Sequence, residues 1–222
     1  GGNTFSGSLR STLSNDSWGS TSAYRVPVTG INPQEGKLTD KTTPTWEATF
    51  GGPILKDKIW FFAAGRYYDQ SDALTGTTAY TGITYPYGNE EPRYEGKLTI
   101  SPFQSHTLTG SYINTETTQA NNWYTSAPIM DLASLYERVL PTELLAFNYN
   151  GVLSDSFFVE AQYSSKKFTF ENSGSIYTDL IKGTLLLDRS RGSARYNSPT
   201  FCGVCTPEKR DNEDILLKGT YF

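Results

Sequence analysis

Residues 58–69, KIWFFAAGRYYD, combine an apolar series of side chains with a mixed series that contains Trp60, Phe62, Arg66 and Tyr68. Ile59, Phe61 and Tyr67 share one parity, whereas Arg66 has the other. Successive side chains of a β-strand point to opposite faces, so this segment predicts a strand between two different surroundings. A strand buried on both faces would explain the aromatic residues but not the arginine.

The same alternation recurs along the chain and predicts about eight strands. Besides 58–69, the alternating segments are residues 3–14, 45–51, 93–101, 106–116, 143–153, 157–171 and 214–222. Within 157–171 the apolar parity changes, because Phe168 and Phe170 are even-numbered while the preceding apolar residues are odd-numbered. This change predicts a β-bulge near Ser165–Lys167.

The connections between these strands alternate strictly between short and long. The short ones are residues 52–57, 101–105 and 154–156, and the long ones are 15–44, 70–92, 117–142 and 173–212. In a membrane β-barrel one rim carries short turns and the other carries long loops. We therefore predict an all-β fold, an antiparallel transmembrane β-barrel section of about eight strands with short periplasmic turns and long extracellular loops.

In a hairpin of residues 45–51 and 58–69, the two faces would have different surroundings. Its apolar face, with Trp46 as an example, would contact lipid, and Glu47 and Arg66 would face the lumen. Aromatic rings near strand ends suit the membrane interface. An arginine that faced lipid at mid-depth would cost about 2–4 kcal/mol, whereas the barrel interior accommodates it.

Composition excludes several other classes of protein. Aromatic residues make up 14% of the chain, which disfavours intrinsic disorder, and hydrophobic residues make up only 36%, which disfavours a thick soluble core. The net charge is −4 and the basic residues are scattered, so no basic face for nucleic acid is expected.

Residues 51–68, GGPILKDKIWFFAAGRYY, resemble the second barrel hairpin of TonB-dependent outer-membrane receptors, and most closely their Oar-like group. Residues 1–10, GGNTFSGSLR, are similar to the segment of that family in which the plug ends and the first barrel strand begins. The resemblance implies that residues 1–222 are the N-terminal part of such a barrel, in the outer membrane of a Gram-negative type of cell. The plug, the TonB box and the remaining strands are then expected outside this sequence.

The resemblance also implies a function and its partners. Such a receptor lies in the lipid bilayer of the outer membrane and imports a scarce, bulky nutrient. A periplasmic energy-coupling protein acts on it through the plug. Two alternatives of other classes remain open: a complete small eight-stranded barrel with a structural or adhesive role, and a soluble all-β carbohydrate-binding module whose apolar face is a packed core.

Cys202 and Cys205 are the only cysteines and lie in the longest loop. We predict a local disulfide between them, as expected in an oxidising exterior compartment. Thioredoxin-type activity would need a helix after the pair, and Pro199 and Pro207 oppose one. A zinc site would need two further ligands, and the only histidine, His106, is expected at the opposite rim.

No pattern of residues predicts catalysis, a metal site or a cofactor. His106 is the single histidine, and no Gly-x-Ser-x-Gly sequence is present. Acidic residues near the loop ends match no calcium-loop spacing; they are Glu90, Glu91, Asp211, Glu213 and Asp214. We therefore expect no enzymatic activity, no metal and no cofactor.

The long loops contain aromatic residues and one segment with helical spacing. Aromatic residues in them either stack on a ligand or pack the loops together, and the sequence leaves both readings open; they are Trp18, Tyr80, Tyr85, Tyr87, Trp123 and Tyr124. Residues 128–140, PIMDLASLYERVL, place apolar residues at helical spacing and predict a short helix within an external loop.

Overall fold

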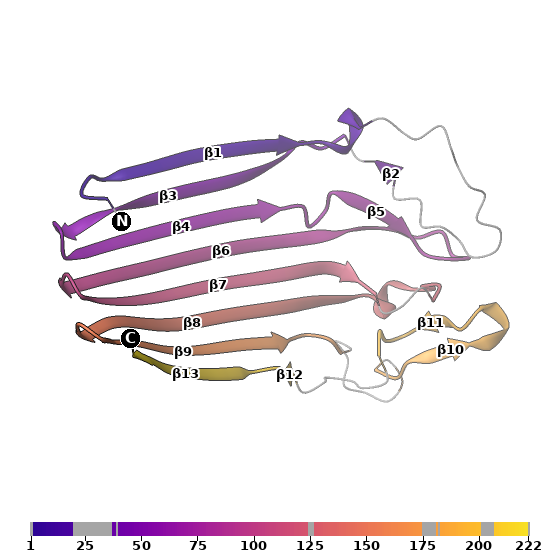
Figure 1. Cartoon of the computed structure of the whole chain (residues 1–222). Coiled ribbons are helices and arrows are strands. Elements are labelled where there is room, and N and C mark those ends of the chain that lie inside the picture. The colour runs from indigo at the N-terminus through magenta and orange to yellow at the C-terminus, as the bar shows by residue number, and fades with distance from the viewer. Residues whose placement is uncertain are drawn as a thin grey trace.

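A single antiparallel sheet makes up most of the protein (Figure 1). The computed structural model describes residues 2–19, 37–38, 40–123, 127–174, 181, 183–200 and 207–221. Within these residues the sheet has 11 strands, and neighbouring strands pair in the order β1-β3-β4-β6-β7-β8-β9, with β13 on the far side of β9. The predicted all-β, antiparallel class is therefore confirmed.

Eight long strands form this path, and each overlaps one of the eight alternating segments of the sequence. They are β1 (Ser6–Ser14), β3 (Thr43–Leu55), β4 (Ile59–Asp69), β6 (Thr84–Phe103), β7 (His106–Asn122), β8 (Tyr136–Ser154), β9 (Phe157–Phe170) and β13 (Asn212–Tyr221). The short strands are β2 (Lys37–Leu38), β5 (Leu74–Thr77) and β12 (Glu208–Lys209), and β10 (Leu186–Asp188) pairs with β11 (Ala194–Tyr196) in a separate hairpin. Among the described residues no ladder joins β1 to β13, so the sheet is open and a closed barrel is not formed.

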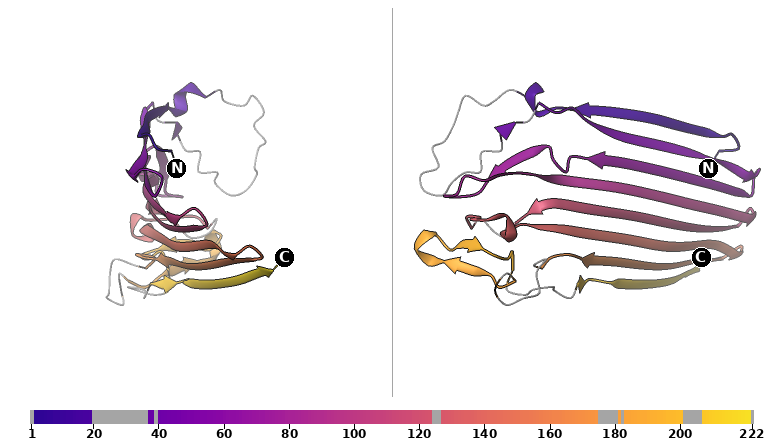
Figure 2. Two further views of the ribbon diagram at one scale, coloured as in Figure 1. Left: turned by 60° about the vertical axis from the view of Figure 1, so that its left-hand side comes forward. Right: turned by 180° about the vertical axis from the view of Figure 1, so that it is seen from behind.

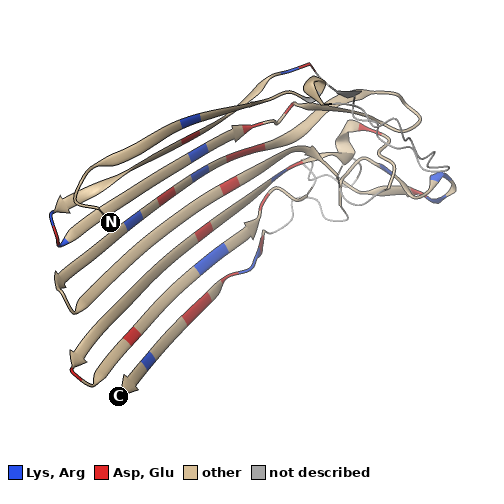
Figure 3. Cartoon of the chain, turned by 45° about the horizontal axis from the view of Figure 1, so that its top comes forward, with Lys and Arg blue, Asp and Glu red and all other residues tan. Residues whose placement is uncertain are grey.

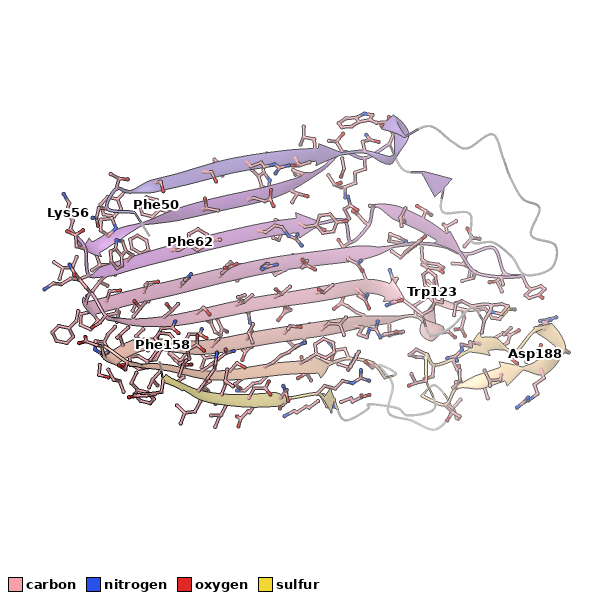
Figure 4. The ribbon with its side chains drawn as sticks, in the orientation of Figure 1. Phe50, Lys56, Phe62, Trp123, Phe158 and Asp188 are labelled. Atoms are coloured by element: carbon pink, nitrogen blue, oxygen red, sulfur yellow. The ribbon has the colours of Figure 1, made fainter. Side chains whose placement is uncertain are left out.

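The connections are sorted between the two ends of the sheet, as their lengths predicted. Tight turns link β3 to β4, β6 to β7 and β8 to β9 at one end, which we call the turn rim (Figure 1). The long connections, together with β5 and the β10–β11 hairpin, lie at the other end, the loop rim. In Figure 4, Lys56 marks the turn rim, and Trp123 and Asp188 mark the loop rim.

A left-handed residue and side-chain hydrogen bonds stabilise the β3–β4 turn at the turn rim. Asp57 lies at its tip with a φ of 62°, a left-handed conformation that aspartate tolerates better than most residues. Asn3 holds this turn from outside: its Oδ1 accepts hydrogen bonds from the Asp57 backbone N–H at 3.0 Å and from the Trp60 indole N–H at 3.2 Å. The Asn3 amide N–H also donates to the Asp57 carboxylate.

Two strands are longer than their sequence patterns indicated. The pattern for residues 93–101 stops at Pro92, yet β6 begins at Thr84 and passes through that proline. Pro92 has no N–H to donate, and the β6–β7 ladder is interrupted there and resumes on both sides. Strand β8 likewise passes through Pro141, which pairs with Glu116.

The predicted helix over residues 128–140 is wrong. Its second half, from Tyr136 onward, belongs to β8 and pairs with β7. Only a single 3-10 turn, η2 (Leu132–Ser134), is helical, and Asp131 caps it by accepting from the Ser134 backbone N–H at 3.0 Å. Tertiary pairing thus overrides the apparent helical spacing.

The predicted bulge near Ser165–Lys167 is also wrong. Pairing between β8 and β9 continues without a shift from Thr142 opposite Phe168 as far as Val152 opposite Phe158. Phe168 and Phe170 simply lie on the other face of the sheet, where the guanidinium groups of Arg138 and Arg210 lie 5.7 and 4.7 Å from the Phe170 ring centre. These cation–π contacts explain aromatic residues at that parity.

Candidate functional site: an open sheet with two different faces

One face of the sheet is lined by apolar side chains across all eight long strands. The pairing register joins Phe61 of β4 to Leu98, Gly110, Phe147, Tyr163 and Ile215 on successive strands. The other register rows on this face also join apolar residues across the strands. We call this side the apolar face; its large members include Leu9, Trp46, Phe50, Ile59, Phe61, Tyr67, Tyr94, Leu98, Ile100, Leu108, Tyr112, Leu145, Phe147, Tyr149, Val159, Tyr163, Ile215 and Leu217.

The apolar face is open to its surroundings. Trp46 is 48% exposed and Leu217 is 75% exposed. Figure 2 shows the sheet as one curved layer, and the strand contacts of the described residues run between neighbours in the sheet. A contiguous exposed apolar surface of this extent marks contact with another molecule or with a membrane, because soluble monomers expose only small apolar patches.

Aromatic rings mark both ends of this face. Near the turn rim the Phe5, Phe50 and Phe61 rings pack with centroids 5.6 to 6.4 Å apart. Phe5 lies against Gly52, where any Cβ would come within 2.3 Å of its ring, so the glycine makes this close approach possible. Toward the loop rim Trp46 lies opposite Tyr67.

The opposite side, the polar face, carries a ladder of charges. Arg10, Glu47, Arg66 and Arg93 lie in one register row on four adjacent strands. The Arg10 Nε is 3.6 Å from a Glu47 carboxylate oxygen. Charged segments cross the strands as a band in Figure 3, with uncharged stretches between most of that band and the turn rim.

Ion pairs on the polar face join residues of different register rows as well as residues of neighbouring strands. Arg66 donates to the Glu91 carboxylate, which also accepts from the Thr117 hydroxyl at 3.1 Å. Arg93 pairs with Glu95 at 3.5 Å. Beside them a hollow of about 190 Å³ is lined by small residues and by the charged side chains of this ladder. A polar face of this kind suits contact with water or with another polar surface.

The most buried hydrophobic side chains lie at the loop rim, in the long connections and at the adjoining strand ends. Ala79, Met130 and Ala194 form one cluster, and Tyr85, Ile129 and Leu135 form a second. The first cluster joins three long connections, and the second joins the β7–β8 connection to Tyr85 near the start of β6. Together we call them the loop core. The hydrophobic side chains that are buried in the described residues all lie toward the loop rim.

Backbone hydrogen bonds tie the loop core together. The Ala79 N–H donates to the Ile129 carbonyl at 2.7 Å, and the Met130 N–H donates to the Arg195 carbonyl at 3.0 Å. The Asp131 carboxylate accepts from the Asn197 backbone N–H at 2.9 Å. The β4–β6, β7–β8 and β9–β13 connections therefore form one packed unit above the sheet.

This packing decides between the two readings of several loop aromatics. Tyr85 is buried, and the Tyr87 and Trp123 rings pack against it at centroid distances of 6.3 and 6.5 Å, so these three join loops together. Tyr80 is exposed, with the Arg191 guanidinium 5.3 Å from its ring centre. Trp18 is exposed as well, and Tyr124 lies outside the described residues.

Hydrogen bonds shift the pKa of two loop carboxyls. The Ser190 hydroxyl, and then the Ser190 backbone N–H and the charge of Arg191, hold the pKa of Asp188 below its ordinary value. The Asn15 side-chain amide, and then the Ser17 hydroxyl, lower the pKa of Asp40 in the same way. Both groups therefore stay ionised in mildly acidic surroundings.

The structure tests only some of the residues singled out in the sequence. Cys202 and Cys205 lie outside the described residues, so their disulfide stays a prediction. His106 begins β7 at the turn rim, as expected, and its Nδ1 lies 2.7 Å from the Tyr149 hydroxyl. Glu90 and Glu91 belong to β6 rather than to a loop end, and Glu213 and Asp214 belong to β13.

The described part of the chain has neither a cluster of metal-ligating side chains nor a membrane-spanning helix. No group of three or more histidine, cysteine or acidic side chains there is arranged to hold a metal ion. No helix there is long and apolar enough to cross a membrane.

Comparison with known proteins gives no relative. No protein-family model, no curated protein sequence and no solved structure matches this chain.

Proposed function

We propose that residues 1–222 form part of the β-barrel wall of a TonB-dependent outer-membrane receptor. The observation that carries this proposal is the distribution of burial. The sheet exposes a continuous apolar face, while the buried hydrophobic side chains gather at the loop rim. Such a sheet needs an apolar solvent on one side, and the hydrocarbon region of a bilayer is that solvent.

The polar face supports a lumen on the other side. Outer-membrane barrels alternate apolar side chains toward lipid with polar side chains toward the interior. The ladder of Arg10, Glu47, Arg66 and Arg93 lies on the side opposite the apolar face, where ionised groups stay hydrated or paired. The two rims divide short turns from long loops, which is the arrangement expected for periplasmic and extracellular ends.

The free edges of the sheet bear on the same proposal. Backbone N–H and C=O groups within a bilayer need hydrogen-bond partners, so a membrane sheet has to close. In the described residues β1 and β13 each have one unpaired side. We propose that these edges pair with further strands of the same receptor barrel, as the resemblance of residues 51–68 implies.

The loops are assigned the capture of the nutrient. The loop core holds three of the four long connections in fixed positions, which supports a preformed surface at the extracellular rim. Energy for import would come from a periplasmic coupling protein acting through the plug of the receptor. Neither catalysis nor nucleic-acid binding is part of the proposed role.

The test is the intact mass of the native protein, combined with membrane fractionation of the same cells. We expect an outer-membrane species several times heavier than the 24.6 kDa of this chain. An outer-membrane species of 24.6 kDa would instead support a complete small barrel with a structural or adhesive role. A protein that stays monodisperse without detergent would overturn the membrane assignment and support the soluble carbohydrate-binding module.

A further inference from the structure

The hollow of about 190 Å³ on the polar face is lined by charged side chains from two adjacent register rows. Glu47 of β3, Arg66 of β4 and Arg93 of β6 share one row. Ala64 lies in the next row toward the turn rim, with Glu95 directly opposite it. Two guanidinium groups and two carboxylates therefore line one hollow, and the short side chain of Ala64 leaves space among them.

Arg66 and Arg93 lie directly opposite each other on neighbouring strands. Like charges in this arrangement destabilise a sheet, whereas opposite charges stabilise it. Arg66 donates to Glu91, toward the loop rim, and Arg93 lies 3.5 Å from Glu95, toward the turn rim. Within the described residues the two guanidinium groups have no carboxylate in common. An oxyanion that contacted both would remove their repulsion.

Much of the hydrogen-bonding capacity around the hollow is unused. The side chains of Glu47, Arg93 and Glu95 make no hydrogen bond with another described residue. Glu47 lies 3.6 Å from Arg10, and the Arg93–Glu95 distance of 3.5 Å is likewise longer than a hydrogen bond of about 2.7–3.2 Å. The Arg66 Nε is buried with no hydrogen-bond partner among the described residues, which is rare in native proteins. Donors and acceptors are thus both unfilled at one hollow.

The charges of this group balance, which favours a ligand that carries both signs. The three ion pairs supply three cations and three carboxylates: Arg10, Arg66, Arg93, Glu47, Glu91 and Glu95. A simple anion in the hollow would meet carboxylates, and a simple cation would meet guanidinium groups. A zwitterion can place its oxyanion at the guanidinium groups and its ammonium group at a carboxylate.

The dimensions of the hollow suit a small zwitterionic group. Neighbouring strands lie about 4.8 Å apart, so residues of adjacent positions can contact both charges of one small molecule. A cavity of about 150 Å³ holds benzene, and this hollow is larger. It therefore has room for an ammonium group and an oxyanion joined by a few atoms.

We propose that this hollow binds a zwitterionic group of the imported nutrient, with an oxyanion and an ammonium group close together as in an α-amino acid. The inference rests on the proposed function, which makes the polar face the wall of the lumen and brings the nutrient to it. Arg66 and Arg93 donate to the oxyanion, and Glu95 accepts from the ammonium group. Arg66 lies near the loop-rim end of β4, on the side from which the nutrient enters.

Three probes with related carbon skeletons separate the two charges. L-alanine carries both groups, propionate lacks the amino group, and ethylamine lacks the carboxylate. Ligand-detected NMR gives their dissociation constants for the native protein in a non-ionic detergent at constant ionic strength. We expect L-alanine to bind at least about tenfold more tightly than propionate or ethylamine, because each of these loses one set of charge-assisted hydrogen bonds.

Variants of the hollow identify the groups responsible. Arg93→Gln should reduce the affinity for L-alanine to that for ethylamine, and Glu95→Gln should reduce it to that for propionate. Ala64→Leu keeps every charge but fills the hollow, so it should remove the preference for L-alanine even if a charge variant does not assemble. Lys218→Gln is the control, because it removes a cation of the polar face that pairs with Glu160 on β9, away from the hollow.

The opposite results would overturn the inference. Propionate or ethylamine binding as tightly as L-alanine would show a site for a simple anion or a simple cation. An equal loss in Lys218→Gln and Arg93→Gln would show that the charge of the whole polar face attracts the probes. If no probe binds, the inference fails while the membrane assignment stands. The proposed function fails separately, if the protein stays monodisperse without detergent, whichever probe binds.

Discussion

Trp46 on β3 lies directly opposite Tyr67 on β4, with both rings exposed on the apolar face of the sheet. One residue further along each strand, Glu47 lies opposite Arg66 on the polar face. The two pairs place aromatic and charged groups on opposite sides of one hairpin.

Adjacent alanines on β4 provide a matched test of the two faces. Ala63 belongs to the apolar face, in the row of Phe50 and Gly96, and Ala64 belongs to the polar face opposite Thr49. In the proposed membrane barrel, Ala63→Arg should cost about 2–4 kcal/mol of the free energy of unfolding in lipid, because the proposal places this residue against lipid. Ala64→Arg should cost less than about 1 kcal/mol, since the proposal places the polar face toward the barrel interior.

The measurement is the urea dependence of folding of the whole native protein in phosphatidylcholine vesicles. Equal losses for the two variants, or a greater loss for Ala64→Arg, would contradict the assignment of the faces.

The Arg66–Glu91 pair should contribute more to stability than the Arg10–Glu47 pair. Arg66 donates to a carboxylate that also binds Thr117, and the Glu91 side chain is 23% exposed. The Arg10 side chain is 72% exposed, and solvent screens its pair. We expect Arg66→Gln to cost about 1 kcal/mol and Arg10→Gln close to zero.

A double-mutant cycle with Glu91→Gln isolates the pair, using the free energy of unfolding in the same vesicles. A coupling energy near zero would show that Arg66 and Glu91 are independent.

Met130 should hold the loops together without affecting the strands. Its side chain is 2% exposed between Ala79 and Ala194, whereas Leu132 is 47% exposed on the same connection. Met130→Ala should lower the free energy of local opening by about 2–5 kcal/mol, because it leaves a cavity. Leu132→Ala is the control and should have little effect.

Hydrogen exchange of the loop amides, compared with the strand amides, measures the result. Faster exchange confined to residue 130 and its neighbours, with the β10–β11 hairpin unchanged, would show that the loops are not one unit.

The β10–β11 hairpin should loosen in acid. Hydrogen bonds from Ser190 hold the pKa of Asp188 below its ordinary value of 3.8. A depressed folded-state pKa means that its contribution is present above the unfolded pKa and is lost as the pH falls through the folded pKa. Proteolysis of the hairpin by an acid-active protease should therefore accelerate below about pH 3.8, and Asp188→Asn should remove most of that pH dependence.

Alternation along single strands predicted the division of the faces, and the register confirms it. Glu47 and Arg66 share a face, as their parities indicated, because the side-chain period of a strand is fixed at two residues. The partner of Arg66 was not predictable: it bonds Glu91 on a third strand, and register between strands is not encoded in the alternation of one. The prolines made the strands look shorter than they are: Pro92 interrupts the β6–β7 ladder and Pro141 stays paired with Glu116, and neither proline ends its strand.

The loop core had no sequence signal. Ala79, Met130 and Ala194 come from three connections with no common periodicity, and their contact depends on how the sheet brings its loops together. The helical spacing around Ile129 and Leu135 is explained by that contact as well, because both residues are buried in the loop core with Tyr85.

The loop core also has a consequence for the order of folding. Its three connections are separated by β6, β7, β8 and β9, so contacts among them close long stretches of chain and carry a large entropic cost unless those strands have already paired. Hairpins at the turn rim, in contrast, need only short closures. Assembly should therefore proceed from the turn rim, and the three connections should come together as its last and slowest step.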